Sequence, residues 1–273
     1  MLKRLAPVEP KRPARIHPAF RDAHSKVFWA KDKIDQLEFV ARGYAQNGVR
    51  TFIEHADGEP YLLHVLTDQL QFPVHLQVGD IVRNLRGSLD HAVAALYRAH
   101  NKRDDSSMVK WYTGTDRQSL ESALNGALVK HGFGELKSFF LDEMEHTEAK
   151  GSPIYQLNKI DRANKHRQLN VVVVVASAPI PDFAFGDGGL MQGSQIIQGP
   201  GQHGTFEFPQ RTFIFDQRTA PFSSKLTFGP SEVFANSDVI PTLKNLASLV
   251  PKCLIEFQQA CLKCYPDKFA SDA

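Results

Sequence analysis

The longest regular pattern in the chain is an apolar repeat near its N-terminus. Its apolar residues alternate in steps of three and four, at Phe20, Ala23, Val27, Ala30, Ile34, Leu37, Ala41 and Tyr44. This heptad spacing predicts one helix about 42 Å long with a single apolar seam. The seam must be covered along its whole length, either by another part of the chain, as in a helical hairpin, or by a second copy in a dimer.

The rest of the chain alternates between extended and helical patterns. Residues 49–55 and 61–70 predict a β-hairpin with Asp57-Gly58 at its turn. Further helices are expected at 78–100, 117–130, 135–146, from Pro153 through the following charged segment, and at 238–265. Strands are expected at 171–176, 205–208, 211–215 and 225–228. This order predicts an α+β fold, in which a helical bundle with a long N-terminal helix packs with an antiparallel sheet built from the early hairpin and the C-terminal meander.

Domain organisation follows from composition and length. Residues 1–16 are rich in Pro, Lys and Arg, and we expect a flexible basic arm there. Residues 17–273 are long enough to bury a substantial core, and we expect them to form a single α+β domain.

Charge and cysteine content narrow the class of protein. The formal net charge is only +2, so no general basic field indicates nucleic-acid binding. The longest apolar run, 171–176, is far too short to span a bilayer, and the N-terminus lacks the apolar core of a signal peptide. The three cysteines are odd in number, which favours a reducing, cytoplasmic setting. Because the histidines lack metal-ligand spacing, we expect neither a metal nor a cofactor.

Two short segments combine acid, base and imidazole within helical patterns that must dock on a core. The first runs from Arg83 to His91, and the second from Asp161 to Arg167. In the first, Arg86 and Asp90 are four residues apart, and Arg83 lies on the same stripe. Charged groups beside a core are costly unless they are paired, so these segments are candidate sites.

The second segment carries a polar residue in an apolar position. Asn164 lies on the same helical arc as Leu157 and Ile160, and such an intrusion usually has a partner. We expect the first segment to be that partner, with Arg83 or Arg86 against Asp161 and Asp90 against Lys165. The arrangement is either an ion-pair network that fixes helix register or a pocket that binds an anion and moves protons.

The same residues resemble a widespread family of uncharacterised bacterial proteins with an NLRxxLDH segment followed by a DxxxKHR segment. The matching residues are Asn84-Leu85-Arg86, Leu89-Asp90-His91, and Asp161 with Lys165-His166-Arg167. The resemblance covers about residues 75–175. It implies a shared architecture and brings no established activity.

The Arg86-x4-His91 spacing also resembles the signature of the HEPN superfamily of helical ribonucleases. That resemblance implies a homodimer that cleaves RNA without metal, of a toxin or phage-defence type. His91 would then transfer protons and Arg86 would stabilise the phosphorane charge, with Asp90 and His166 assisting. The ligand-binding residues would be Arg83, Asn84, Asp161, Asn164, Lys165 and Arg167. The competing hypothesis is a non-enzymatic binding or assembly module whose charged helices form a structural ion-pair network.

Overall fold

The computed structural model describes twelve stretches of the chain. They are residues 15–47, 49–54, 61–67, 73–102, 109–166, 169, 171–176, 183–185, 190–191, 203–208, 212–214 and 223–270. Of the predicted basic arm, residues 1–14 lie outside the described part. At the end of the arm and just after it, the main chain of Arg15 and His17 is bonded to the side chain of Gln258, at 2.9 and 3.0 Å.

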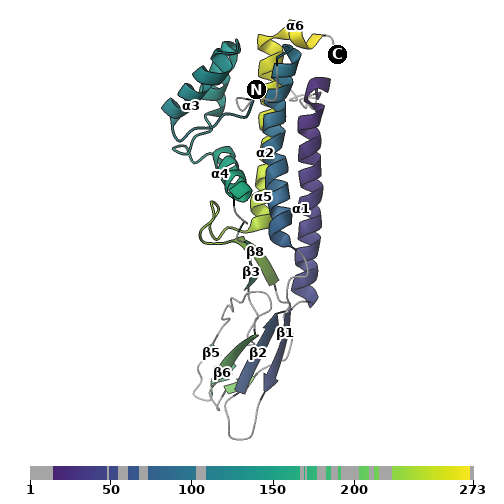
Figure 1. Ribbon diagram of the computed structural model, residues 1–273. Helices are drawn as coiled ribbons and strands as arrows, with labels where there is room; N and C mark the ends of the chain where they lie inside the picture. Colours follow the sequence, from purple (N-terminus) through teal and green to yellow (C-terminus); the bar gives the residue numbers. More distant parts are fainter. Residues whose placement is uncertain are drawn as a thin grey trace, which may run out of the picture.

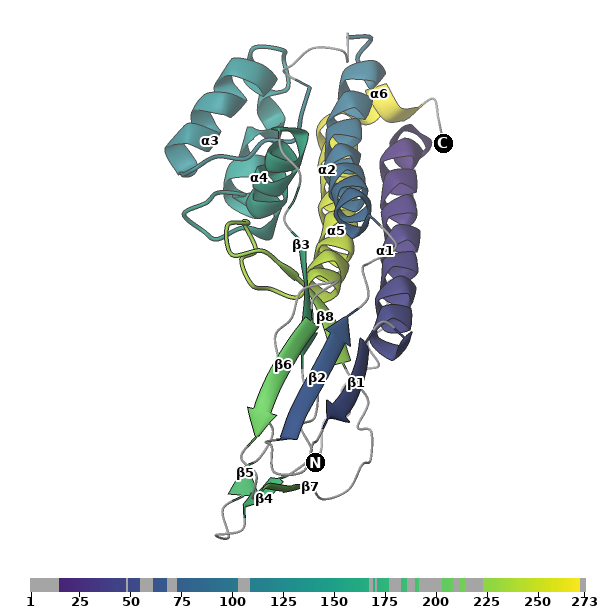
Figure 2. The ribbon, with the colours of Figure 1, turned by 60° about the horizontal axis from the view of Figure 1, so that its bottom comes forward.

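Three long helices, α1 (Arg21–Asn47), α2 (Val74–Ala99) and α5 (Val239–Cys264), lie side by side and form the centre of the molecule (Figures 1 and 2). The short turn η1 (Pro18–Phe20) leads into α1. The seam residues of α1 from Phe20 to Leu37 are at most 3% exposed, because α2 and α5 cover them. The seam is therefore part of the core of one chain, and its alternative interpretation as a dimer seam is wrong.

A second helical layer lies beside α2 and α5 (Figure 2). It contains α3 (Arg117–Leu124), the short π-helices η2 (Asn125–Val129) and η4 (Phe139–Met144), the 3-10 helix η3 (Gly134–Leu136), and α4 (Pro153–His166). Trp111 joins this layer to the central helices, since its ring lies 5.2 Å from that of Phe140 and 5.3 Å from that of Phe257 on α5. The last helix, α6 (Pro266–Phe269), returns Phe269 onto Phe20 with ring centroids 5.6 Å apart.

The strands that the structure describes form three small sheets. In the first, β1 (Val49–Glu54), β2 (Tyr61–Thr67) and β6 (His203–Phe208) pair in that order. In the second, β3 (Val171–Ala176) pairs with β8 (Ser223–Phe228). In the third, β4 (Phe183–Phe185) lies between β5 (Leu190–Met191) and β7 (Thr212–Ile214). All pairs are antiparallel, and the sheets extend from the end of the bundle where α1 ends and α2 begins (Figure 1).

The predicted α+β fold, with one sheet packed against the bundle, is therefore wrong. Most of the described residues are helical, and the strands form only small sheets of two or three members. The physical reason is that α1, α2 and α5 bury their apolar faces against one another. The strands therefore lie at one end of the bundle, where β8 contacts α1 and α5. No described helix is both long enough and apolar enough to cross a membrane.

Candidate functional site

The two charged segments lie on α2 and α4, and these helices face each other. The Nε of Arg86 donates a hydrogen bond to Oδ1 of Asn158 at 2.9 Å. The amide of Asn164 donates to the carbonyl of Gly79 at 3.2 Å. Because the later α2 residue pairs with the earlier α4 residue, the two helices are antiparallel. The helices that carry the two segments therefore pack together, but Arg86 and Asn164 bond to residues just outside the opposite segment, Asn158 and Gly79.

Gly79 of α2 lies directly against the Asn164 side chain of α4. A Cβ atom at this position would lie 2.6 Å from Oδ1 of Asn164, well inside van der Waals contact. Only a glycine therefore leaves room for the Asn164 side chain at this point of α2. This contact explains why a polar residue occupies an apolar arc of α4.

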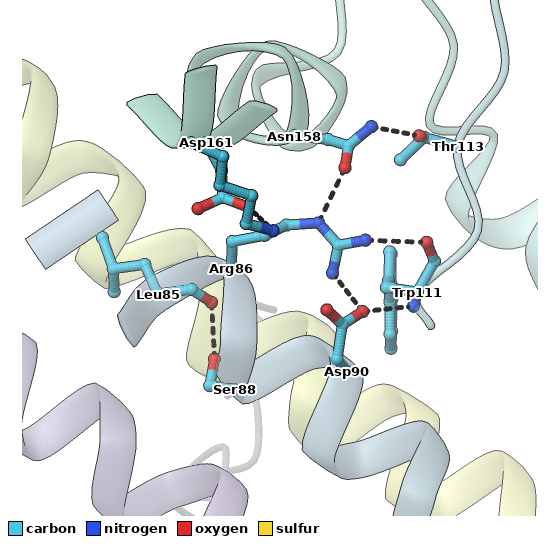
Figure 3. A network of polar contacts seen from close by, with 9 residues as sticks. Leu85, Arg86, Ser88, Asp90, Trp111, Thr113, Asn158 and Asp161 are labelled. Carbon is cyan, nitrogen blue, oxygen red and sulfur yellow. Dashed lines mark hydrogen bonds and ion pairs between the residues drawn. The ribbon is translucent and has the colours of Figure 1, made fainter. Parts of the chain in front are cut away.

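The guanidinium of Arg86 is buried, with the residue only 5% exposed, and each of its three nitrogens donates a hydrogen bond (Figure 3). Nη1 pairs with Asp90, and Nη2 donates to the carbonyl oxygen of Trp111 at 3.2 Å. Asp90 also accepts from the Trp111 amide at 2.7 Å, and Asn158 donates to Thr113 at 3.1 Å. These five residues, the Arg86 network, join α2, α4 and the segment before α3.

The ion pairs form within each helix and do not connect the two. Arg86 pairs with Asp90 on α2, and Asp161 pairs with Lys165 on α4 at 2.6 Å. The predicted pairs of Arg83 or Arg86 with Asp161, and of Asp90 with Lys165, are wrong. Residues four apart on one helix are already neighbours, so the intrahelical pairs form there. Asp161 is 2% exposed, and its Oδ1 has no hydrogen-bond partner within the described ranges.

His91 lies on a different side of α2 from Arg86. Five residues of helix separate their directions by about 140°. His91 is close to α1, and burial, followed by the charges of Lys26 and Arg98, lowers its pKa. Its Nδ1 is buried and has no partner in the part of the chain that the structure describes. Within one chain, the proposed acid–base group and phosphate stabiliser are thus not brought together.

The remaining candidate residues that the structure describes are exposed or half-buried. Arg83, Lys165 and His166 are exposed, and Asn84 donates to the carbonyl and carboxylate oxygens of Asp80 at 2.9 and 3.1 Å. Arg167 lies outside the described residues. Among the residues that can be searched, no three His, Cys, Asp or Glu side chains meet as metal ligands would.

Sequence reasoning missed the neutral members of the Arg86 network. Asn158 lies three residues before Asp161, about 60° away around the helix, so the helical period could have placed it near the contact face. Trp111 and Thr113 gave no such signal, because they act through an irregular segment. A polar pocket of about 280 Å³ was also missed. It lies at the first turns of α4, lined by Glu148, Gly151, Tyr155, Gln156, Lys159, Glu232 and Val233.

Comparison with known proteins adds no family. No protein-family model, curated protein or solved structure matches this chain. The two resemblances carried by Arg86, His91 and the DxxxKHR segment stay predictions.

Proposed function

We propose that this protein is a non-enzymatic binding or assembly module in which α2 and α4 form a structural polar network. The burial of Arg86, with all three guanidinium nitrogens donating inside the protein, supports this function best. An arginine that stabilises a phosphorane must present free donors to the phosphate. A buried arginine whose three nitrogens are all engaged inside the protein instead fixes how two helices pack.

The surface that we propose for assembly is the outer face of α1, consisting of Phe28, Trp29, Asp32, Asp35 and Phe39. Phe28 is 69% exposed, Trp29 51% and Phe39 79%. Phe28 and Phe39 are eleven residues apart, so they lie on one stripe about 16 Å apart. Exposed aromatic side chains on a folded helix are the residue type that dominates protein interfaces.

Trp29 is held in position before any partner binds. Its Nε1 donates to Oδ2 of Asp80 on α2 at 3.3 Å, and the ammonium of Lys33 lies 4.8 Å from its ring centroid. A side chain fixed in this way loses little conformational entropy on binding. The outer face of α1 is therefore preorganised around Trp29.

The partner that we propose is a second copy of the chain, with its α1 antiparallel to the first. Two-fold symmetry then places Phe28 opposite Phe39 of the partner subunit, and the same contact occurs twice. Asp32 and Asp35 lie between the two phenylalanines, so their carboxylates approach those of the partner. Because like charges repel and salt screens them, the dimer should be weak and should strengthen as ionic strength rises.

Sedimentation velocity at rising protein concentration tests this assembly. Wild type is expected to dimerise, whereas a Phe28→Ser, Phe39→Ser double variant should stay monomeric at every concentration. Val129→Ser is the matched control, because Val129 is an exposed apolar residue on another element, and it should dimerise like wild type. A wild type that remains monomeric at high salt would contradict the proposed dimer.

A second assay tests the absence of catalysis. Single-stranded RNA and tRNA are incubated with wild type, Arg86→Ala and His91→Ala in EDTA, after circular dichroism has confirmed that each variant is folded. We expect no cleavage by any of them. Cleavage by wild type that both substitutions abolish would establish a ribonuclease and exclude the proposed function.

A further inference from the structure

A buried imidazole connects the start of α4 to α5. His146 is 8% exposed, with Nδ1 3.0 Å from Oγ of Ser152 and Nε2 3.8 Å from Sγ of Cys253. Its ring lies 6.2 Å from that of Trp111. Ser152 immediately precedes α4, and its carbonyl accepts the amide of Gln156 at 3.0 Å. His146 thus links the first turn of α4 to the core.

The surroundings of His146 suit only a neutral ring. A neutral imidazole carries one N–H, which the Ser152 hydroxyl can accept. A protonated ring would direct its second N–H at the thiol of Cys253, which is a weak acceptor. Burial accordingly lowers the pKa of His146 to about 4.

Carboxylates near this segment are already paired with other groups. Glu145 faces Arg117 and Lys150 at 3.9 and 3.7 Å. Glu148 accepts from Tyr155 and Lys159 at 2.9 and 3.0 Å. On α5, the charges of Glu256 and Lys252 both act on Cys253, with opposite effects on its thiol. No carboxylate is bonded to His146 in the described part of the chain.

We propose that His146 is an acid-operated latch, whose protonation releases the first turn of α4 from α5. In the neutral form, the ring bridges Ser152 and Cys253 and keeps α4 seated. In the protonated form, the buried charge lacks a counterion, and the segment opens so that water can solvate the ring. Because α4 also carries Asn158, opening loosens the Arg86 network.

The direction of the pH effect follows from the two protonation equilibria. The pKa of a solvated histidine is about 6.5, and burial lowers the pKa of His146 when α4 is packed against α5. His146 therefore binds a proton less tightly in the closed form than in the open form. The latch is complete above pH 6.5 and is lost as the pH falls from 6.5 toward 4. At pH 5 the equilibrium constant for opening should be about 30-fold larger than at pH 7.5.

Hydrogen exchange of the whole chain measures this opening at the amides of Ser152 and Gln156, after correction for intrinsic exchange rates. Wild type should lose about 30-fold in protection there between pH 7.5 and pH 5. His146→Asn, which can bond to Ser152 but cannot take up a proton, should show no such loss. Unchanged protection in wild type, or an equal loss in His146→Asn, would overturn the latch.

Two further measurements keep the test decisive. Amides in the middle of α1 should keep their protection at pH 5, and an equal loss there would mean global unfolding and overturn a local latch. Cys253→Ser supplies a better acceptor to a protonated His146, so its loss of protection should be clearly smaller than that of wild type. An undiminished loss in Cys253→Ser would overturn the proposal even if His146→Asn failed to fold.

Discussion

Replacing Gly79 with alanine is the sharpest test of the contact between α2 and α4. Alanine favours the helical conformation over glycine by about 1 kcal/mol, so the substitution would stabilise an isolated helix. In this protein, however, the new Cβ would lie 2.6 Å from Oδ1 and 2.9 Å from Nδ2 of Asn164. Asn164 must then move away and lose its bond to the Gly79 carbonyl.

The two effects have opposite signs, and their sizes decide the outcome. A lost hydrogen bond costs about 1 kcal/mol, and overpacking costs about 1–3 kcal/mol. After the gain in helix propensity, Gly79→Ala should lower the free energy of unfolding by about 1–3 kcal/mol. In an Asn164→Ala background the clashing atoms are gone, so the same substitution should raise it by about 1 kcal/mol.

Urea unfolding, followed by circular dichroism at helical wavelengths, gives these free energies for the four proteins of the cycle. Gly87→Ala is the matched control, because its Cβ would meet only the Lys26 side chain, at 3.8 Å or more. That control should be stabilised by about 1 kcal/mol in both backgrounds. The reasoning is refuted if Gly79→Ala changes the free energy of unfolding in the same direction with and without the Asn164 side chain.

Two other predictions concern the core. Arg86→Met should lower the free energy of unfolding by about 2–3 kcal/mol, because it leaves buried acceptors without donors; the loss is not larger because the ion-pair partner, Asp90, is partly exposed. Arg83→Met on the same helix should change the free energy of unfolding by less than about 0.5 kcal/mol. Equal effects of the two substitutions in urea titrations would contradict this. Burial raises the pKa of Cys253 to about 12 and that of Cys261 well above its usual value, so an alkylating reagent at pH 8 should label Cys264 first in the native protein and all three thiols in urea. Mass spectrometry reads the sites, and early labelling of Cys261 would show that α5 opens more readily than its burial implies.

The long helices could be predicted because their periodicity is local. The seam from Phe20 to Leu37 specifies a helix with one buried face, and that face is buried. The same pattern does not say whether the covering helix belongs to the same chain or to another. That choice depends on α2 and on α5, which lies more than 200 residues after the seam, and spacing within α1 contains no information about either.

For the strands, the sequence predicts the extended segments but not how they pair. Apolar, β-branched runs such as 171–176 identify extended segments, and β3 is found there. Which strands pair depends on contacts over long sequence separations, for example Val171 opposite Phe228. A single sheet packed on the bundle was the simplest arrangement, but the helices had already covered their own apolar faces.

For the candidate site, helical geometry correctly predicted that α2 and α4 face each other, but it did not predict which side chains bond across their contact. The helical spacing placed Arg86 and Asn164 at the contact between α2 and α4, as observed. The prediction also assumed that opposite charges would pair across this contact. The neutral Asn158 instead bonds to Arg86, because an intrahelical aspartate at position 90 already supplies the counterion.

The interhelical contacts together specify a single register of α4 on α2. A shift of one turn would take Asn158 away from Arg86 and leave a buried guanidinium with fewer acceptors, which is strongly unfavourable. The same shift would place Asn164 opposite His75 or Arg83, where a side chain would occupy the space that Gly79 leaves open. Only the observed register avoids both the unpaired guanidinium and the steric clash. The polar groups therefore select one register, whereas the apolar residues of the two helices would allow several. We conclude that the charge buried between α2 and α4 contributes more to the specificity of helix packing than to its stability.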